Sequence, residues 1–143
     1  MRILFLTSSS GTYMAPPRLG SSQINAGPDW PDETAPDGRV VSLRTPVGEY
    51  DLAAVLERIP LGQRPDAVVA LVDSSWRNRP LNVRAFAGPK ALLVADTHHL
   101  KSPLIGMITY MASESFDRFV LLYDRHHAEI FRSAGLENLF WLP

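Results

Sequence analysis

The chain has 143 residues, 45% of them hydrophobic and 20% charged, which is enough for one hydrophobic core and too little for two large domains. Its formal net charge of −1 argues against a large nucleic-acid interface, and no run of residues is long and apolar enough for a helix that spans a membrane. Cysteine is absent, which excludes disulfides and thiolate chemistry, so we expect a cytoplasmic protein that does not insert into a membrane.

The N-terminal part of the chain predicts one buried strand followed by a long loop. The unbroken apolar run Ile3–Leu6 is typical of a buried strand, and the polar residues after it predict a turn. Between Tyr13 and Gly38 the hydrophobic periodicity is lost, while prolines and glycines recur and exclude a continuous helix. We therefore expect a loop over residues 13–38, long enough to cover a binding site.

The middle of the chain predicts two strands with a helix between them. The strands are expected over Arg39–Leu43 and Ala67–Val72. Asp51 is a candidate N-cap for the helix, and Pro60 ends it. Apolar residues recur along this helix at helical spacing and give it one apolar face: Leu52, Val55, Leu56 and Ile59.

The second half of the chain continues the same alternation. A short helix is predicted over Leu81–Phe86, and a strand follows over Ala91–Ala95. A longer helix is expected to start at Pro103, because proline is favoured at the first helical position. Two further apolar runs predict strands over Phe119–Tyr123 and Leu139–Leu142.

The last predicted helix lies between the two final strands and leads to the fold prediction. It is expected from Asp124, its candidate N-cap, to Ala134, with Gly135 in the left-handed conformation at its end. Strands that alternate with helices favour a parallel sheet with right-handed crossovers. We therefore predict an α/β fold, a Rossmann-like three-layer sandwich with a mostly parallel sheet, formed by residues 1–143 as one domain.

Three of the predicted strands stop at an aspartate, and this pattern locates a candidate site. Asp73, Asp96 and Asp124 each follow an apolar run directly. If these strands are parallel neighbours, the three carboxylates gather at one edge of the sheet, where open α/β sheets bind ligands. Asp73 and Asp124 also suit a turn and a helix cap, whereas no helix starts directly after Asp96.

The turn after the first strand is a second candidate. Its residues Ser9, Ser10, Gly11 and Thr12 offer hydroxyl and backbone N–H groups that could cradle a phosphate. The segment that follows does not predict a helix whose dipole would favour an anion, so an ordinary polar turn is the alternative. The glycine patterns of dinucleotide and P-loop nucleotide sites are absent.

All four histidines occur as two doublets close to strand ends. They are His98-His99 and His126-His127. With Asp96, one member of each doublet could bind zinc, but hydrogen bonding to a polyhydroxy or phosphorylated ligand is favoured, and no metal ion is expected. His98 could also abstract a proton with help from Asp96, because histidine titrates near neutral pH.

Two tryptophans are expected at the same edge of the sheet. Trp30 lies in the predicted loop, and Trp76 follows Asp73. Their faces would suit the apolar C–H patches of sugar rings. The alternative is that they pack loops onto the domain.

Three stretches in the second half of the chain carry a resemblance to a known family. They are the strand end Val94–His99, with an acid before a histidine pair, the segment Phe119–His127, and the segment Phe131–Pro143, which contains a glycine and ends in Trp-Leu-Pro. Together they resemble the N-terminal half of CgeB-like, GT-B type glycosyltransferases. The first strand shares only its general character with that family.

The resemblance implies that residues 1–143 form the acceptor-side domain of a larger protein, and that a C-terminal domain absent from these residues holds a nucleotide sugar. It implies sugar transfer to an acceptor, with His98 or Asp96 as the catalytic base. These residues alone should be inactive, because half of a GT-B cleft supplies only part of the positioning that catalysis requires. No cofactor is expected. The residues expected to bind substrate are Ser9, Ser10, Gly11, Thr12, Trp30, Asp73, His99, Asp124 and His126.

Two alternatives from other classes stay open at this stage. The chain could be a non-catalytic Rossmann-like binding or assembly module, whose helix Leu104–Met111 and terminal Phe140-Trp141 pack against another chain, such as a second copy in a homodimer, or against a missing domain. It could also be a flavodoxin-like flavin binder, in which case the purified protein would be yellow. We expect it to be colourless.

Overall fold

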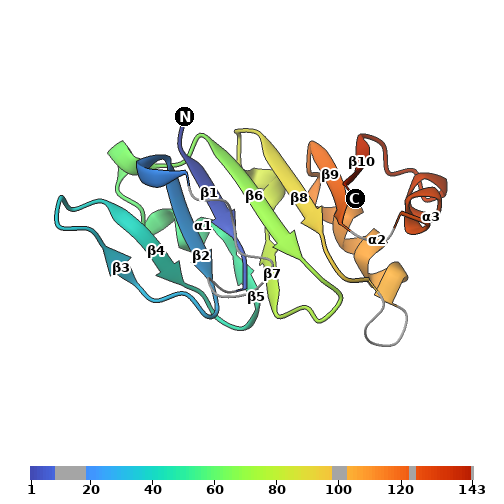
Figure 1. Ribbon diagram of the computed structural model, residues 1–143, viewed down its shortest axis with the longest axis horizontal. Coiled ribbons are helices and arrows are strands. Elements are labelled where there is room, and N and C mark those ends of the chain that lie inside the picture. Colours follow the sequence, from blue (N-terminus) through green and yellow to red (C-terminus); the bar gives the residue numbers. More distant parts are fainter. Residues whose placement is uncertain (9–18, 98–102, 123–124, 143) are drawn as a thin grey trace.

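The computed structural model describes residues 1–8, 19–97, 103–122 and 125–142. Within these residues an eight-stranded sheet runs the length of the molecule in the order β10-β9-β8-β6-β1-β2-β4-β3 (Figure 1). Every neighbouring pair in it is parallel except β3 and β4. The predicted α/β, Rossmann-like fold with a mostly parallel sheet is therefore confirmed.

The elements have the following bounds. The strands of the large sheet are β1 Ile3–Leu6, β2 Gln23–Gly27, β3 Glu33–Thr34, β4 Val40–Arg44, β6 Ala67–Val72, β8 Lys90–Val94, β9 Arg118–Leu122 and β10 Leu139–Leu142. A second, two-stranded parallel sheet consists of β5 Gly48–Asp51 and β7 Asn78–Leu81. The α-helices are α1 Leu52–Glu57, α2 Pro103–Glu114 and α3 His127–Ser133, and short 3-10 helices span Gly20–Ser22 (η1), Leu61–Gln63 (η2) and Val83–Ala85 (η3).

The hydrophobic core lies between the three helices and one face of the large sheet. The chain steps across the sheet in one direction from β4 to β6, β8, β9 and β10, so right-handed connections bring α1, α2 and α3 to the same face. Strand residues on that face are fully buried against helix residues. The core includes Leu4, Leu6, Val68, Ala70, Val72, Leu92, Val94 and Leu121 from the strands, and Leu52, Val55, Met107, Tyr110, Met111 and Phe131 from the helices.

The opposite face of the sheet is polar over β2 and β4. Gln23 and Asn25 are buried there and satisfy each other through a hydrogen bond from Gln23 Nε2 to Asn25 Oδ1 at 2.6 Å. The buried Ser42 hydroxyl donates to the carbonyl of Pro31 at 2.7 Å. Toward β8, β9 and β10 the same face carries apolar side chains that are partly or largely exposed, such as Leu93, Val120 and Leu142.

The small sheet is fastened to the large one by a buried asparagine. Asn78 of β7 donates to the carbonyls of Leu6 and Leu71, both at 2.9 Å, and accepts from the Tyr50 hydroxyl of β5 at 2.7 Å. These bonds use both amide hydrogens and the amide oxygen of a side chain that is only 4% exposed. Asn78 therefore satisfies its own polar atoms while it joins the two sheets.

Several local predictions are confirmed. Asp51 caps α1 by accepting from the backbone N–H of Ala53 at 2.8 Å. Helix α2 begins at Pro103, and Gly135 has a φ of +84° after α3. The predicted strands at Ile3–Leu6, Ala67–Val72 and Leu139–Leu142 have the expected bounds, and the three others shift by one residue.

Other predictions need correction. Residues 13–38 are not one loop, because β2 and β3 form within them, and β2 was missed since its alternate residues Gln23 and Asn25 are polar. The helix predicted over Leu81–Phe86 is only the 3-10 helix η3, and Leu81 belongs to β7. Helix α3 begins at His127 with His126 at the N-cap position, whereas the predicted cap Asp124 lies outside the described residues.

The apolar face predicted for dimer formation on α2 is used inside the domain. Met107, Tyr110 and Met111 are buried in the core, and Leu104 and Ile108 pack against it. Ile105 is on the other side of the helix and is exposed. The helix therefore belongs to the domain's own core.

Candidate functional site

The parallel strands of the large sheet end at one edge of the molecule, which we call the carboxyl edge. Backbone hydrogen bonds continue between the segments that leave these strands. Ser74 N–H donates to the Asp96 carbonyl at 2.9 Å, and Asp29 N–H donates to the Ser8 carbonyl at 3.0 Å. The ends of β6 and β8, and those of β1 and β2, therefore lie side by side at this edge.

The ends of β1 and β2 approach each other so closely that a side chain is excluded between them. A Cβ atom at Gly27 would lie 1.7 Å from the carbonyl oxygen of Thr7. Beside this contact the backbone N–H of Thr7 donates to the carbonyl of Ala26 at 2.9 Å. Glycine at this position therefore allows the segment after β2 to turn directly over the end of β1.

Trp30 is held at the carboxyl edge by both its ring and its backbone. The indole N–H donates to the Thr7 hydroxyl at 3.1 Å, and the Trp30 carbonyl accepts from Arg44 Nε at 3.1 Å. The side chain is half-buried, so part of the ring stays accessible. Trp30 thus packs its segment onto the domain, and its contact with a ligand stays a prediction.

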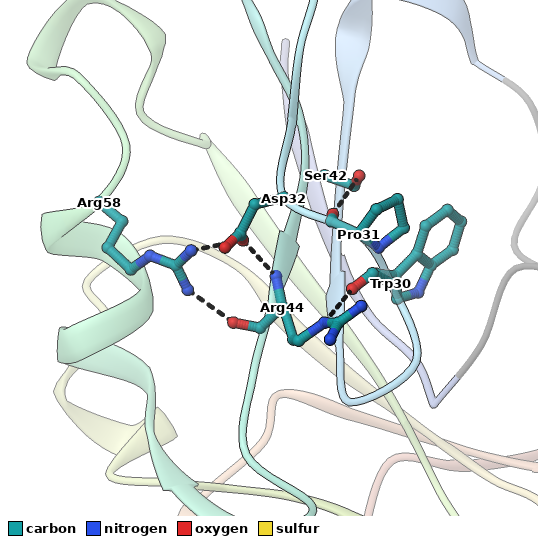
Figure 2. A network of polar contacts seen from close by, with 6 residues as sticks. All are labelled: Trp30, Pro31, Asp32, Ser42, Arg44 and Arg58. Atoms are coloured by element: carbon teal, nitrogen blue, oxygen red, sulfur yellow. Dashed lines mark hydrogen bonds and ion pairs between the residues drawn. The ribbon is translucent and has the colours of Figure 1, made fainter.

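An ionic network beside Trp30 fixes this segment to β4 and to Arg58, the residue that follows α1, as Figure 2 shows. Asp32 Oδ1 accepts from Arg44 N–H at 2.7 Å and from Arg58 Nη2 at 2.5 Å, while Arg58 Nη1 donates to the Arg44 carbonyl at 2.6 Å. The hydrogen bond from the Arg44 backbone, assisted by Arg58, lowers the pKa of Asp32. The carboxylate therefore stays ionised and keeps the network intact at neutral pH.

A salt bridge that was not predicted from the sequence spans the carboxyl edge at the end of β1. Arg77 donates to both carboxylate oxygens of Asp29, from Nη2 at 2.6 Å and from Nε at 3.2 Å. The two residues are 48 positions apart, so no local spacing pattern could have paired them. Paired in this bidentate geometry, they connect the segment after β2 with the segment after β6.

The predicted site residue Asp73 shapes its own turn. Its Oδ1 accepts from the backbone N–H of Ser75 at 2.9 Å and from the Ser75 hydroxyl. This is the turn-forming role that aspartate commonly has. The carboxylate is half-buried at the carboxyl edge, next to the end of β8.

Trp76, which follows this turn, packs against helix α2. Its ring lies edge-on to Tyr110 with centroids 5.7 Å apart, and the Arg79 guanidinium lies 4.6 Å from its ring centroid. A Cβ atom at Gly106 would be 3.2 Å from the ring. Trp76 is therefore a packing residue between the turn and the helix.

The segment after β8 meets the start of α3 through a threonine and a histidine. Thr97 Oγ1 and His127 Nδ1 are joined by a hydrogen bond of 2.6 Å, and Thr97 is only 1% exposed. Asp96 precedes Thr97 and is half-buried. The second histidine doublet thus lies close to Asp96, which follows β8. His127 makes the hydrogen bond to Thr97. The predicted site residue His126 is exposed, and its ring centroid lies 4.1 Å from that of His127.

Seven predicted site residues lie outside the described residues, and their roles stay predictions. They are Ser9, Ser10, Gly11, Thr12, His98, His99 and Asp124. Among the residues that the structure describes, no group of three histidine, aspartate or glutamate side chains is arranged to hold a metal ion. In the same part of the chain, no helix has the length and apolar character needed to cross a bilayer.

The comparisons with known proteins leave the site to be interpreted from its own geometry. No family model, no curated protein and no solved structure matches this chain.

Proposed function

We propose that this chain is the acceptor-side domain of a GT-B type glycosyltransferase. In this proposal the carboxyl edge holds an acceptor that bears a hydroxyl group, and a second domain presents the nucleotide sugar. The observation that carries the proposal is the Thr97–His127 hydrogen bond of 2.6 Å, which joins the segment after β8 to the start of α3 beside Asp96. Ligands of open α/β sheets bind beyond this edge, and an acid with nearby imidazoles there suits proton transfer.

The proposed reaction assigns a base to this half of the cleft. The acceptor oxygen attacks the anomeric carbon of the sugar, and the nucleoside diphosphate leaves with the electrons of the broken C–O bond. The acceptor proton passes to a base, for which Asp96 and His98 are the candidates. Asp96 is half-buried at the end of β8, a setting that limits competition by water for its carboxylate.

Trp30 supports a sugar or another ring-bearing acceptor at the same edge. Its indole N–H is already used by Thr7, so the ring presents its apolar part and offers no free ring donor. Aromatic faces of this kind pack against the C–H patches of sugar rings. The rigid attachment through Arg44 limits the entropy lost when a ligand is bound.

The test is nucleotide release in a full-length enzyme that carries this domain. We expect His98→Ala or Asp96→Asn, whichever removes the base, to lower kcat at least about 100-fold, the usual contribution of general base catalysis. Glu137→Gln changes an exposed carboxylate away from the site and should leave turnover unchanged. Full turnover in both His98→Ala and Asp96→Asn would refute the assignment. Residues 1–143 alone should release no nucleotide.

A second candidate function, an assembly module, is favoured by the face of the sheet opposite α1, α2 and α3. Phe140 and Leu142 of the edge strand β10 are 52% and 53% exposed on this face, next to the partly exposed Leu93 and Val120. Contiguous apolar surface of this kind commonly marks an interface. We propose that a second copy of the chain covers it.

Sedimentation velocity tests this second candidate. The chain should sediment as a dimer at micromolar concentration, and Phe140→Ser should shift it to the monomer. Leu61→Ser, which changes an 82% exposed leucine elsewhere, is the matched control and should leave the dimer intact. A monomer at every concentration would exclude the homodimer.

A further inference from the structure

A hollow with a basic wall lies at the carboxyl end of the last two strands. It has a volume of about 590 Å³ and is lined by Arg125, His126, Ala128, Glu129, Arg132 and Trp141, and we call it the corner pocket. Its walls come from the segment between β9 and α3, from the exposed side of α3, and from β10. The corner pocket thus belongs to the edge where α/β sheets bind ligands, but none of its residues except His126 was predicted as a site residue.

The charged side chains of the corner pocket leave an excess of positive charge. The Arg125 guanidinium lies 5.2 Å from the ring centroid of Trp141, and no carboxylate among the described residues pairs with it. Arg132 donates to Glu129 at 2.7 Å, which neutralises one of the two arginines. Arg125 therefore remains available to an anion, and the exposed His126 offers a further donor beside it.

Trp141 lines the pocket with its ring and carries a donor without a protein partner. Its indole N–H is buried and has no acceptor among the residues that the structure describes. Buried donors of this kind normally bind a protein group, a water molecule or a ligand. The ring itself is held in place by β10, which pairs with β9 through Trp141 and Leu121.

We propose that the corner pocket binds the phosphate group of a small phosphorylated sugar. A phosphomonoester carries nearly two negative charges and three acceptor oxygens. It therefore matches the Arg125 guanidinium, which has no carboxylate partner among the described residues, better than a ligand carboxylate would. A bare phosphate ion would leave most of the 590 Å³ empty, whereas a sugar phosphate fills more of it. The inference rests on the proposed function for the ligand's role, because the phosphorylated sugar would then be the acceptor.

The experiment is isothermal titration calorimetry of this chain with hexose and pentose monophosphates. At least one of them should bind saturably and at least about tenfold more tightly than the unphosphorylated sugar, inorganic phosphate or glucuronate. Arg125→Gln should weaken that binding about tenfold, whereas Arg84→Gln, which changes an exposed arginine on η3, should leave it unchanged.

A second pair of variants should change the affinity for the sugar phosphate in the opposite direction. Glu129→Gln removes the negative charge of the corner pocket and releases Arg132, so sugar phosphate binding should become severalfold tighter. Glu137→Gln, an exposed carboxylate after α3, should change nothing. A mere loss of folding could not produce tighter binding, so this pair separates a binding role from a structural one.

Several outcomes would overturn the inference. They are the absence of saturable binding by every sugar phosphate, unchanged binding by Arg125→Gln, and binding of inorganic phosphate or glucuronate as tight as that of the best sugar phosphate. The proposed function can be refuted independently of the corner pocket. If a sugar phosphate binds with the expected variant effects but does not serve as acceptor in the full-length enzyme, the corner pocket stands and the acceptor role falls.

Discussion

Replacing Gly27 by alanine tests how the carboxyl edge is built. The added Cβ would lie 1.7 Å from the carbonyl oxygen and 2.8 Å from the carbonyl carbon of Thr7. Both are backbone atoms of the residue that directly follows the central strand β1, so no flexible side chain can move aside. The ends of β1 and β2 must then separate by at least about 1.3 Å, which brings the Cβ to 3.0 Å from the oxygen, before the contact becomes tolerable.

The cost follows from the contacts that this separation breaks. The hydrogen bond from Thr7 N–H to the Ala26 carbonyl, at 2.9 Å, and the one from the Trp30 indole to the Thr7 hydroxyl, at 3.1 Å, both span the gap. At about 1 kcal/mol for each of the two hydrogen bonds and about 1–3 kcal/mol for overpacking, Gly27→Ala should lower the free energy of unfolding by about 3–5 kcal/mol.

Urea unfolding followed by circular dichroism measures this change. Gly62→Ala is the matched control, because a Cβ there meets no atom within 4 Å and its φ is not positive. It should be neutral or stabilise the fold by about 0.5 kcal/mol. If Gly27→Ala lowers the free energy of unfolding by less than about 1 kcal/mol, the close approach of β1 and β2 is not as tight as the structure indicates.

Two further predictions concern the junction between the sheets. Asn78→Ala leaves the carbonyls of Leu6 and Leu71 and the Tyr50 hydroxyl without their partner. The free energy of unfolding measured in urea should therefore fall by about 3 kcal/mol. A loss below about 1 kcal/mol would contradict the network. Burial raises the pKa of Tyr50 and Tyr110 above their ordinary value of 10.0. The stability that the two protonated tyrosines contribute is complete below about pH 10 and is lost as the pH rises above about 10. Above that pH the unfolded chain releases the tyrosine protons, whereas the folded chain keeps them. The free energy of unfolding should fall from about pH 10 upward, by up to about 1.4 kcal/mol per pH unit for each tyrosine, and Tyr50→Phe should reduce this slope. A pH-independent free energy between about pH 9 and 11 would show that these hydroxyls are not buried.

Hydrophobic pattern alone predicted the strands and helices that bury one continuous face. β6, β8 and β9 are apolar runs, and α1 has both a regular apolar face and a capping aspartate. In contrast, β2 is buried on both faces, yet it carries Gln23 and Asn25, which satisfy each other on the polar face. β7 contains a proline and is held by contacts between residues far apart in the sequence, such as those of Asn78.

The location of the candidate site could be predicted, but most of its contacts could not. A parallel sheet necessarily brings the ends of its strands to one edge, and Asp73 and Asp96 follow from this rule. Which side chains meet there depends on turns and on pairs far apart in the sequence, such as Asp29 with Arg77. Similarly, His126 and His127 are adjacent in the sequence, so the sequence does not show which of them contacts Thr97. His127 makes this contact because α3 begins at that residue.

The central claim is that a ligand binds at the carboxyl edge near β8, β9 and β10. Amide and indole N–H chemical shifts of the ¹⁵N-labelled chain, followed by NMR during titration with hexose and pentose monophosphates, test it most directly. We predict saturable shifts that cluster at Thr97, at 125–127 and at the Trp141 indole. Shifts that cluster instead at the opposite edge, around Asp66 and Asp117, or no saturable shift with any of these sugars, would contradict the claim.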